Sequence, residues 1–145
     1  MIPKPAKRPR KPRTRLWKRR RGSKAALARE ADKLWSSIVR TRGECEKPMT
    51  YRCPGPWCSG VIQAAHGLSR RYRNTRWLLI NGFAVCQAHH VYYTHRPIEW
   101  DEWLREAWGQ ATYDELRKLA LSPTPPNIEM ALERLKAEAK SRRIA

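Results

Sequence analysis

The sequence is poor in acidic residues and has no long apolar run. Only 13 of its 145 residues are Asp or Glu, against 31 Lys and Arg, so the formal net charge is +18. No stretch approaches the roughly 18–20 uninterrupted apolar residues that span a bilayer, which argues against a transmembrane helix and a membrane partner. No apolar segment follows the basic N-terminus, so we expect no secretory signal and a cytoplasmic protein.

Acidic residues are absent altogether from Lys47 to Ile98, a segment that holds seven Lys and Arg. Residues 1–24 also lack acids and hold 12 Lys and Arg. Surfaces of one positive sign suit a polyanion, most simply nucleic acid. Four prolines among residues 1–22 block a helix, and like charges repel. We therefore expect a disordered arm there that binds phosphates without sequence preference.

Apolar periodicity and capping residues predict an α+β chain. Ser23 is placed to cap a helix that ends near Arg40, and short strands are expected at 61–65 and 82–86. Further helices are expected at 87–94, at 97–109, after Thr112 and after Asn127. The helical spacing of the tryptophans at 100, 103 and 108 favours packing, and Trp77 is also expected in the core.

The fourth predicted helix begins with the pattern of a capping box, formed by Thr112 and Glu115, and Leu119 is expected to face inward. After it, the sequence SPTPP breaks helical structure. We therefore divide the chain into a basic arm at 1–22, a domain at 23–121, a linker at 122–126 and a C-terminal helix at 127–145.

The four cysteines predict a structural zinc site, because nothing in the sequence indicates export to an oxidising compartment. Cys86 and His89, three residues apart at a strand-to-helix junction, form one half of the predicted site. Two of Cys45, Cys53 and Cys58 form the other half. Cys53 and Cys58 flank a tight loop, whereas Cys45 and Cys58 would make a knuckle opened by an insertion. A site of four cysteines would leave His89 out.

All four histidines lie within one window, His66 to His95, which also contains Asn81. The pattern H-x14-N-x8-H, followed through Cys86-Gln87-Ala88-His89-His90, resembles the HNH, or ββα-metal, nucleases. The wider stretch is similar to phage HNH and NinG-type recombination proteins, over roughly residues 34–120. The segments that carry this likeness are 38–42, 63–71, 75–77, Asn81, 86–90 and 95–97.

The resemblance implies a ββα-metal core and a role for each residue of the pattern. His66 matches the general base, a role that suits a neutral imidazole near neutral pH. Asn81 matches the residue whose amide pins the loop that holds the base. His90 matches a ligand of a catalytic divalent cation, such as Mg²⁺ or Mn²⁺, and His95 is a plausible second ligand.

One position departs from the family pattern. Many HNH proteins carry a metal-ligating Asp or His immediately before the general base, and this chain has Ala65 there. Substrate phosphate oxygens and water would then complete the metal shell, or a carboxylate outside the acid-free segment would fold in. The candidates are Glu44, Glu46, Glu99 and Asp101. A third alternative is weak metal binding with low or lost activity.

Four arginines between the first His and the Asn of the pattern are expected to bind DNA phosphates, because a guanidinium makes bidentate contacts with phosphate oxygens. They are Arg70, Arg71, Arg73 and Arg76.

The leading hypothesis is a metal-dependent DNA endonuclease, encoded by a phage and linked to recombination or DNA processing. The alternative is a non-catalytic, zinc-stabilised protein that binds DNA or DNA junctions on the same scaffold. A third class, a structural or RNA-associated basic protein, leaves the histidine cluster unexplained.

Overall fold

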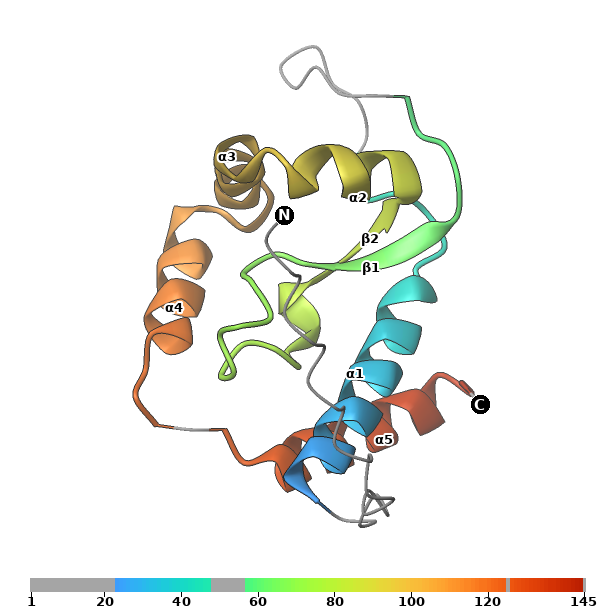
Figure 1. Cartoon of the computed structure of the whole chain (residues 1–145), viewed down its shortest axis with the longest axis vertical. Coiled ribbons are helices and arrows are strands. Elements are labelled where there is room, and N and C mark those ends of the chain that lie inside the picture. Colours follow the sequence, from blue (N-terminus) through green and yellow to red (C-terminus); the bar gives the residue numbers. More distant parts are fainter. Residues whose placement is uncertain (1–22, 48–56, 125, 145) are drawn as a thin grey trace, which may run out of the picture.

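The computed structural model describes residues 23–47, 57–124 and 126–144. The predicted basic arm at 1–22 and Cys53 lie outside these residues. In chain order, the elements of the described part are α1 (Lys24–Arg40), β1 (Ile62–His66), the 3-10 turn η1 (Leu79–Asn81), β2 (Gly82–Cys86), α2 (Gln87–Thr94), α3 (Pro97–Trp108), α4 (Gln110–Ala120) and α5 (Ile128–Ser141). The chain is a small α+β protein, as predicted (Figure 1).

The sheet is an antiparallel pair of two strands. Its register runs from Ile62 opposite Cys86 to His66 opposite Gly82. Helix α2 begins directly after β2, so the order strand, strand, helix is continuous from residue 62 to residue 94. The predicted bounds of β2 and α2 are confirmed, and β1 starts one residue later than predicted.

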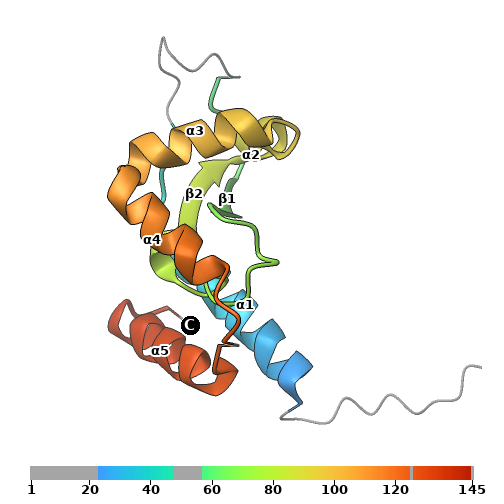
Figure 2. The ribbon, with the colours of Figure 1, turned by 90° about the vertical axis from the view of Figure 1, so that its left-hand side faces the viewer.

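Helix α1 packs against one face of the sheet, and α5 lies beside α1 (Figure 2). The buried face of α1 repeats at helical spacing, through Ala31, Trp35 and Ile38. Helix α5 adds Leu132 and Leu135 to the same cluster. The C-terminal helix is therefore part of the core, although the sequence SPTPP separates it from the rest of the chain.

Helices α3 and α4 cover the opposite face. Phe83, the one phenylalanine of the chain, is surrounded by the tryptophans of α3, with ring centres 4.8 Å from Trp103, 5.4 Å from Trp108 and 5.9 Å from Trp100. The expectation that the tryptophan stripe serves packing is confirmed. Because side chains of a strand alternate between its faces, Ala64 packs toward α1 and Ala65 toward α3 and α4.

Two caps are confirmed and one is wrong. The side chains of Ser23 and Asn127 accept hydrogen bonds from the third residue after each of them, at the starts of α1 and α5. The predicted capping box of Thr112 is wrong, because α4 already begins at Gln110. Gly109 has φ 76°, ends α3, and its carbonyl accepts the first helical hydrogen bond, from Tyr113. Leu119 is 42% exposed and does not face inward.

Candidate metal centre and histidine cavity

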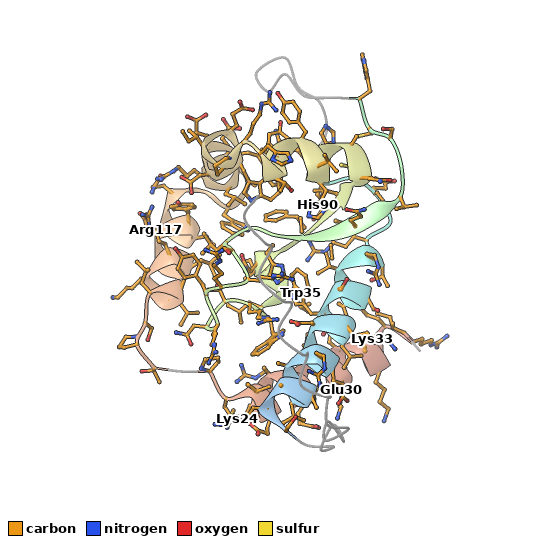
Figure 3. The ribbon with its side chains drawn as sticks, in the orientation of Figure 1. Lys24, Glu30, Lys33, Trp35, His90 and Arg117 are labelled. Carbon is orange, nitrogen blue, oxygen red and sulfur yellow. The ribbon has the colours of Figure 1, made fainter. Side chains whose placement is uncertain are left out.

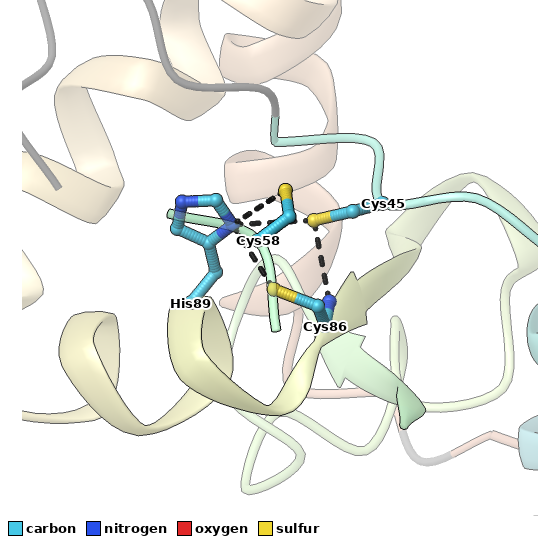
Figure 4. Close-up of side chains that lie close together, drawn as sticks. All are labelled: Cys45, Cys58, Cys86 and His89. Carbon is cyan, nitrogen blue, oxygen red and sulfur yellow. Dashed lines mark hydrogen bonds between the residues drawn. The ribbon is translucent and has the colours of Figure 1, made fainter. Parts of the chain in front are cut away.

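Four of the predicted ligands lie together beside the N-terminal end of α2 (Figure 4). The sulfurs of Cys45 and Cys86 are each 3.3 Å from Nδ1 of His89, and the sulfur of Cys58 is 3.6 Å from it. The four ligand atoms all lie within 4.8 Å of one another. The prediction of a Cys/His site that can hold a metal ion is confirmed to this extent.

These separations fit a tetrahedral ion. With bonds of about 2.3 Å to sulfur and about 2.1 Å to nitrogen, the sulfur-to-nitrogen edge of a tetrahedron is about 3.6 Å. The three separations from Nδ1 of His89 lie at or slightly below this length. These three edges therefore have about the length that a single tetrahedral ion requires.

Backbone hydrogen bonds hold the cysteines in place around α2 and β2. The N–H groups of Gln87 and Ala88, at the start of α2, donate to the carbonyls of Val61 and Ser59, which ties the segment after Cys58 to the helix. On the other side, the N–H of Glu46 donates to the carbonyl of Ala84 over 2.7 Å. Cys45 and Cys58 are thereby both tied to the segment formed by β2 and the start of α2.

The segment that carries Cys45 has further contacts. The backbone N–H of Cys86 donates to the sulfur of Cys45 over 3.2 Å, a contact that favours a thiolate. Next in the chain, the Lys47 ammonium lies 5.2 Å from the ring centre of Tyr93 and 5.3 Å from that of Trp103. A cation over aromatic rings is stabilised there, so Lys47 anchors the segment that carries Cys45.

The thiols influence one another's protonation. Desolvation, followed by the neighbouring Cys45 and Cys86 sulfurs, raises the pKa of the Cys58 thiol to about 11. Burial acts in the same direction on Cys86, but hydrogen bonds from the backbone of His89 and Ser59 outweigh it and lower the pKa of that thiol. Thiols this close resist ionising together, and a bound cation is what stabilises them jointly as thiolates.

The cluster selects among the ligand sets that the sequence left open. It pairs Cys45 and Cys58 with Cys86 and His89, so His89 is part of the site in the described residues. Cys53 lies outside those residues. Because Cys45 and Cys58 come from opposite ends of a long insertion, their spacing alone did not identify them.

His66, the predicted base, ends β1 on the side of the sheet that faces α1. Its ring stacks on the Trp35 ring with centres 3.9 Å apart and planes 14° apart. Its Nε2 lies 3.0 Å from the carbonyl oxygen of Arg76. A carbonyl only accepts hydrogen bonds, so Nε2 carries the hydrogen and Nδ1 keeps the lone pair.

Several groups act on the protonation of this ring. Burial is the main cause that lowers the pKa of His66, and the charges of Arg76 and Arg70 lower it further. The hydrogen bond to the Arg76 carbonyl and the charge of Asp32 act in the opposite direction. The net effect keeps the imidazole neutral at pH 7, in the form that can accept a proton.

Asn81 is fully buried and holds the loop after His66. Its Oδ1 accepts the N–H of Leu68 over 2.7 Å, and its Nδ2 donates to the carbonyls of Leu68 and Thr75, each over 3.0 Å. Its own carbonyl accepts the N–H of Gly67. A side chain at Gly67 would collide with Trp108, so the loop packs too tightly for any larger residue there.

His90 lies on α2, and its Nδ1 is 2.5 Å from Oε1 of Gln63 on β1. The amide oxygen accepts, so Nδ1 carries the hydrogen and Nε2 keeps the lone pair that a metal ion needs. Burial lowers the pKa of His90, which favours the same neutral form. The sequence motif contains Gln63 but gives no sign of this bond, which joins residues 27 positions apart.

His66, at the end of β1, and His90 line one cavity of about 570 Å³, which is bounded by the sheet, the loop after His66, α2, α3 and α4. Asp101, Tyr113 and Arg117 line it as well. Asp101 accepts hydrogen bonds from Tyr113 and Arg105, so its oxygens are already engaged. Two of the other carboxylates that the sequence left open have ion-pair partners: Glu46 with Arg42 and Glu99 with Arg96.

The other predicted residues lie in different settings. His95 is the exposed C-cap of α2 and is not among the residues that line the cavity. Arg70, Arg71 and Arg73 are exposed in the connection after His66. Arg76 differs, because its guanidinium makes two hydrogen bonds with the Asp32 carboxylate, of 2.9 and 2.6 Å. A phosphate would have to displace that carboxylate from Arg76.

Comparisons with protein-family models, with curated proteins and with solved structures give no match to this chain. None of the helices in the described residues is both long and apolar enough to cross a membrane. Inference about function therefore depends on the chemistry of the cavity and of the metal centre.

Proposed function

We propose that the chain is a metal-dependent endonuclease of HNH type, which hydrolyses phosphodiester bonds in DNA. One observation carries this proposal: His66 and His90 line the same cavity, and each has one ring nitrogen held by a hydrogen bond, which leaves the other with its lone pair. A base and a metal ligand for phosphodiester hydrolysis need this arrangement.

In the proposed reaction, Nδ1 of His66 takes a proton from a water molecule as that water attacks the phosphorus. A new bond forms between the water oxygen and phosphorus, and the bond to the leaving oxygen of the neighbouring nucleotide breaks. The leaving oxygen keeps the electron pair of that bond and takes a proton from solvent water. The Arg76 carbonyl and the Trp35 ring keep the imidazole in one tautomer and one orientation. Asn81 acts through the loop that carries the base and touches no reacting atom.

Of the two predicted histidine ligands, His90 lines the cavity, and it would bind a divalent cation through Nε2. Such a cation neutralises charge on the phosphate and on the leaving oxygen. Ala65 offers no donor atom, and Asp101 accepts hydrogen bonds from Tyr113 and Arg105, so phosphate oxygens and water would supply the remaining ligands. His95, the second predicted ligand, would have to move to reach the cavity.

For the Cys/His cluster we propose Zn²⁺ in a structural role. Three sulfurs and one imidazole nitrogen are a donor set that Zn²⁺ favours, and four protein ligands leave no open position for a substrate. Metal analysis of the purified protein should find about one tightly held zinc ion per chain. A protein that is folded and contains no metal would contradict this role.

The second candidate function is a DNA-binding protein that does not cleave. Ala65 favours it, because this residue removes a carboxylate or imidazole that many HNH nucleases use to bind the cation. Plasmid nicking across several divalent metals separates the two candidates. We expect wild type to nick and His66→Ala to lose activity by about 10²–10⁴-fold, the usual contribution of a general base.

Two variants sharpen the nicking experiment. His66→Ala should still bind DNA, which separates a loss of chemistry from a loss of binding. His95→Ala is the matched control, because it removes a histidine at the exposed end of α2, and we expect it to keep most of the nicking activity. If wild type and His66→Ala behave alike with every metal, the endonuclease proposal is wrong.

A further inference from the structure

The cavity has a cationic side chain that the ββα pattern does not include. Arg117 lies on α4 (Figure 3). It lines the same cavity as His66 and His90. Helix α4 lies outside the strand-strand-helix unit and is reached through the tryptophan-rich helix α3. Its position brings a positive charge to the two histidines from a different direction than the basic loop after His66.

A buried tyrosine orients this arginine. Nη1 of Arg117 donates to the hydroxyl oxygen of Tyr113 over 3.3 Å, and Tyr113 is 1% exposed. The hydroxyl has one hydrogen, which it gives to the Asp101 carboxylate, so its oxygen is the acceptor for Arg117. One of the five N–H donors of the guanidinium is thus engaged, and Arg117, although exposed, lies on the cavity wall.

No carboxylate of the described residues lies within ion-pair distance of Arg117. The neighbouring Arg105 pairs with Asp101, and Arg76 pairs with Asp32. Arg117 instead donates to a neutral hydroxyl. Its charge helps to lower the pKa of Asp101, but that carboxylate is already paired with Arg105. A guanidinium held in this way is prepared for an anion from outside the protein.

We propose that Arg117 binds a phosphate group of the nucleic-acid strand that occupies the cavity, at or next to the phosphate that reacts. This inference rests on the proposed function for its ligand, and it makes the α3–α4 pair part of the substrate site. Tyr113 is a positioning residue in it, because it touches Arg117 and not the phosphate. The guanidinium fork matches phosphate oxygens, and the residual donors are sufficient for a bidentate contact.

The test is a comparison of DNA affinity between Arg117→Gln and Lys118→Gln, measured by fluorescence anisotropy over a series of salt concentrations without added divalent cation. Lys118 is the matched control: it is the next residue of α4, is exposed, and does not line the cavity. Both substitutions remove one positive charge. We expect Arg117→Gln to weaken binding about tenfold, the effect of a charged hydrogen bond.

The salt dependence identifies the lost contact as a phosphate contact. Removing one phosphate contact reduces the slope of log K against log salt by about 0.9 on duplex DNA and about 0.7 on a single strand. Lys118→Gln should leave the slope close to that of wild type. Tyr113→Phe should weaken binding less than Arg117→Gln and should add nothing to it in the double variant, because both act through one contact.

Equal affinities and slopes for Arg117→Gln and Lys118→Gln would overturn the inference. A wild type that binds DNA with the predicted Arg117 effect, but never nicks, would refute the endonuclease and leave the phosphate contact in place. A wild type that nicks DNA, while the two variants bind alike, would support the endonuclease and refute the phosphate contact. A wild type that binds no DNA even at low salt would refute both.

Discussion

Asn81 should be among the most costly side chains of the fold to remove. It is 0% exposed, and its side chain makes three hydrogen bonds with the backbone of the loop that follows His66. In Asn81→Ala the Leu68 N–H and two carbonyls lose their partners. Each unsatisfied buried group costs about 1–3 kcal/mol, so a loss of about 3–5 kcal/mol in the free energy of unfolding follows if water reaches part of the loop.

Such a loss is a large fraction of the roughly 5–15 kcal/mol that keeps a small domain folded. Urea unfolding of the metal-loaded protein, followed at low temperature, measures it. Asn81→Asp separates the two halves of the network, because it keeps the acceptor for Leu68 and loses both donors. Its free energy of unfolding should lie between those of wild type and Asn81→Ala at neutral pH, or below both if its charge faces the two carbonyls unpaired.

The matched control is Asn74→Ala. Asn74 also donates through its amide to one backbone carbonyl, that of Ser122 over 2.8 Å, but it is only partly buried. We expect it to lose no more than about 1 kcal/mol. If Asn81→Ala unfolds within about 1 kcal/mol of wild type, the amide does not hold the loop, and its proposed role in positioning His66 fails with it.

Three further predictions concern the histidine, the metal and the arginine. Because burial lowers the pKa of His66, the acid limb of kcat/KM for nicking should have its midpoint below pH 6.5, and a midpoint above 6.5 contradicts this. The stability that depends on neutral His66 should be complete above pH 6.5 and should be lost as the pH falls through the lowered pKa. Metal analysis of Cys58→Ser should find no bound zinc, and this variant should melt at a lower temperature than wild type. The control, Cys53→Ser, should keep about one ion per chain, and equal metal contents in the two variants would refute the ligand set. Asp32→Ala removes the partner of the Arg76 guanidinium and of the Trp77 indole, so chemical denaturation should show a loss of about 1–2 kcal/mol; an unchanged free energy of unfolding refutes the structural role of the pair.

Capping residues and apolar runs predicted most helices and strands well, because these signals act on backbone groups only a few residues away. Ser23 and Asn127 act on N–H groups three residues away, and β2 passes directly into α2 where the apolar run ends. The one capping error has a local cause too. Gly109 at φ 76° allows α4 to begin immediately after α3, and the Thr112 pattern then falls inside the helix.

The sequence predicted which residue types form the site better than it predicted which residues contact one another there. Cys86 and His89 are three residues apart, and the geometry of a helix start brings them together whatever the rest of the fold does. The choice of Cys45 depends on a backbone bond between Glu46 and Ala84, which pairs segments 38 residues apart. The bond between Gln63 and His90 and the stack of His66 on Trp35 likewise depend on tertiary packing that no local spacing encodes.

In the folded chain, acidic residues from other segments lie next to the acid-free segment. Asp32 comes from α1 and neutralises Arg76, while Asp101 comes from α3 and reaches the cavity already bound to Arg105 and Tyr113. These two acids from outside the segment therefore neutralise particular arginines. The exposed arginines of the loop after His66, and Arg117 on the cavity wall, take part in no ion pair within the described residues, so their positive charge is retained. We expect a DNA strand that enters the cavity to neutralise these charges and to offer phosphate oxygens to the cation proposed at His90, so that DNA binding and cation binding should strengthen each other.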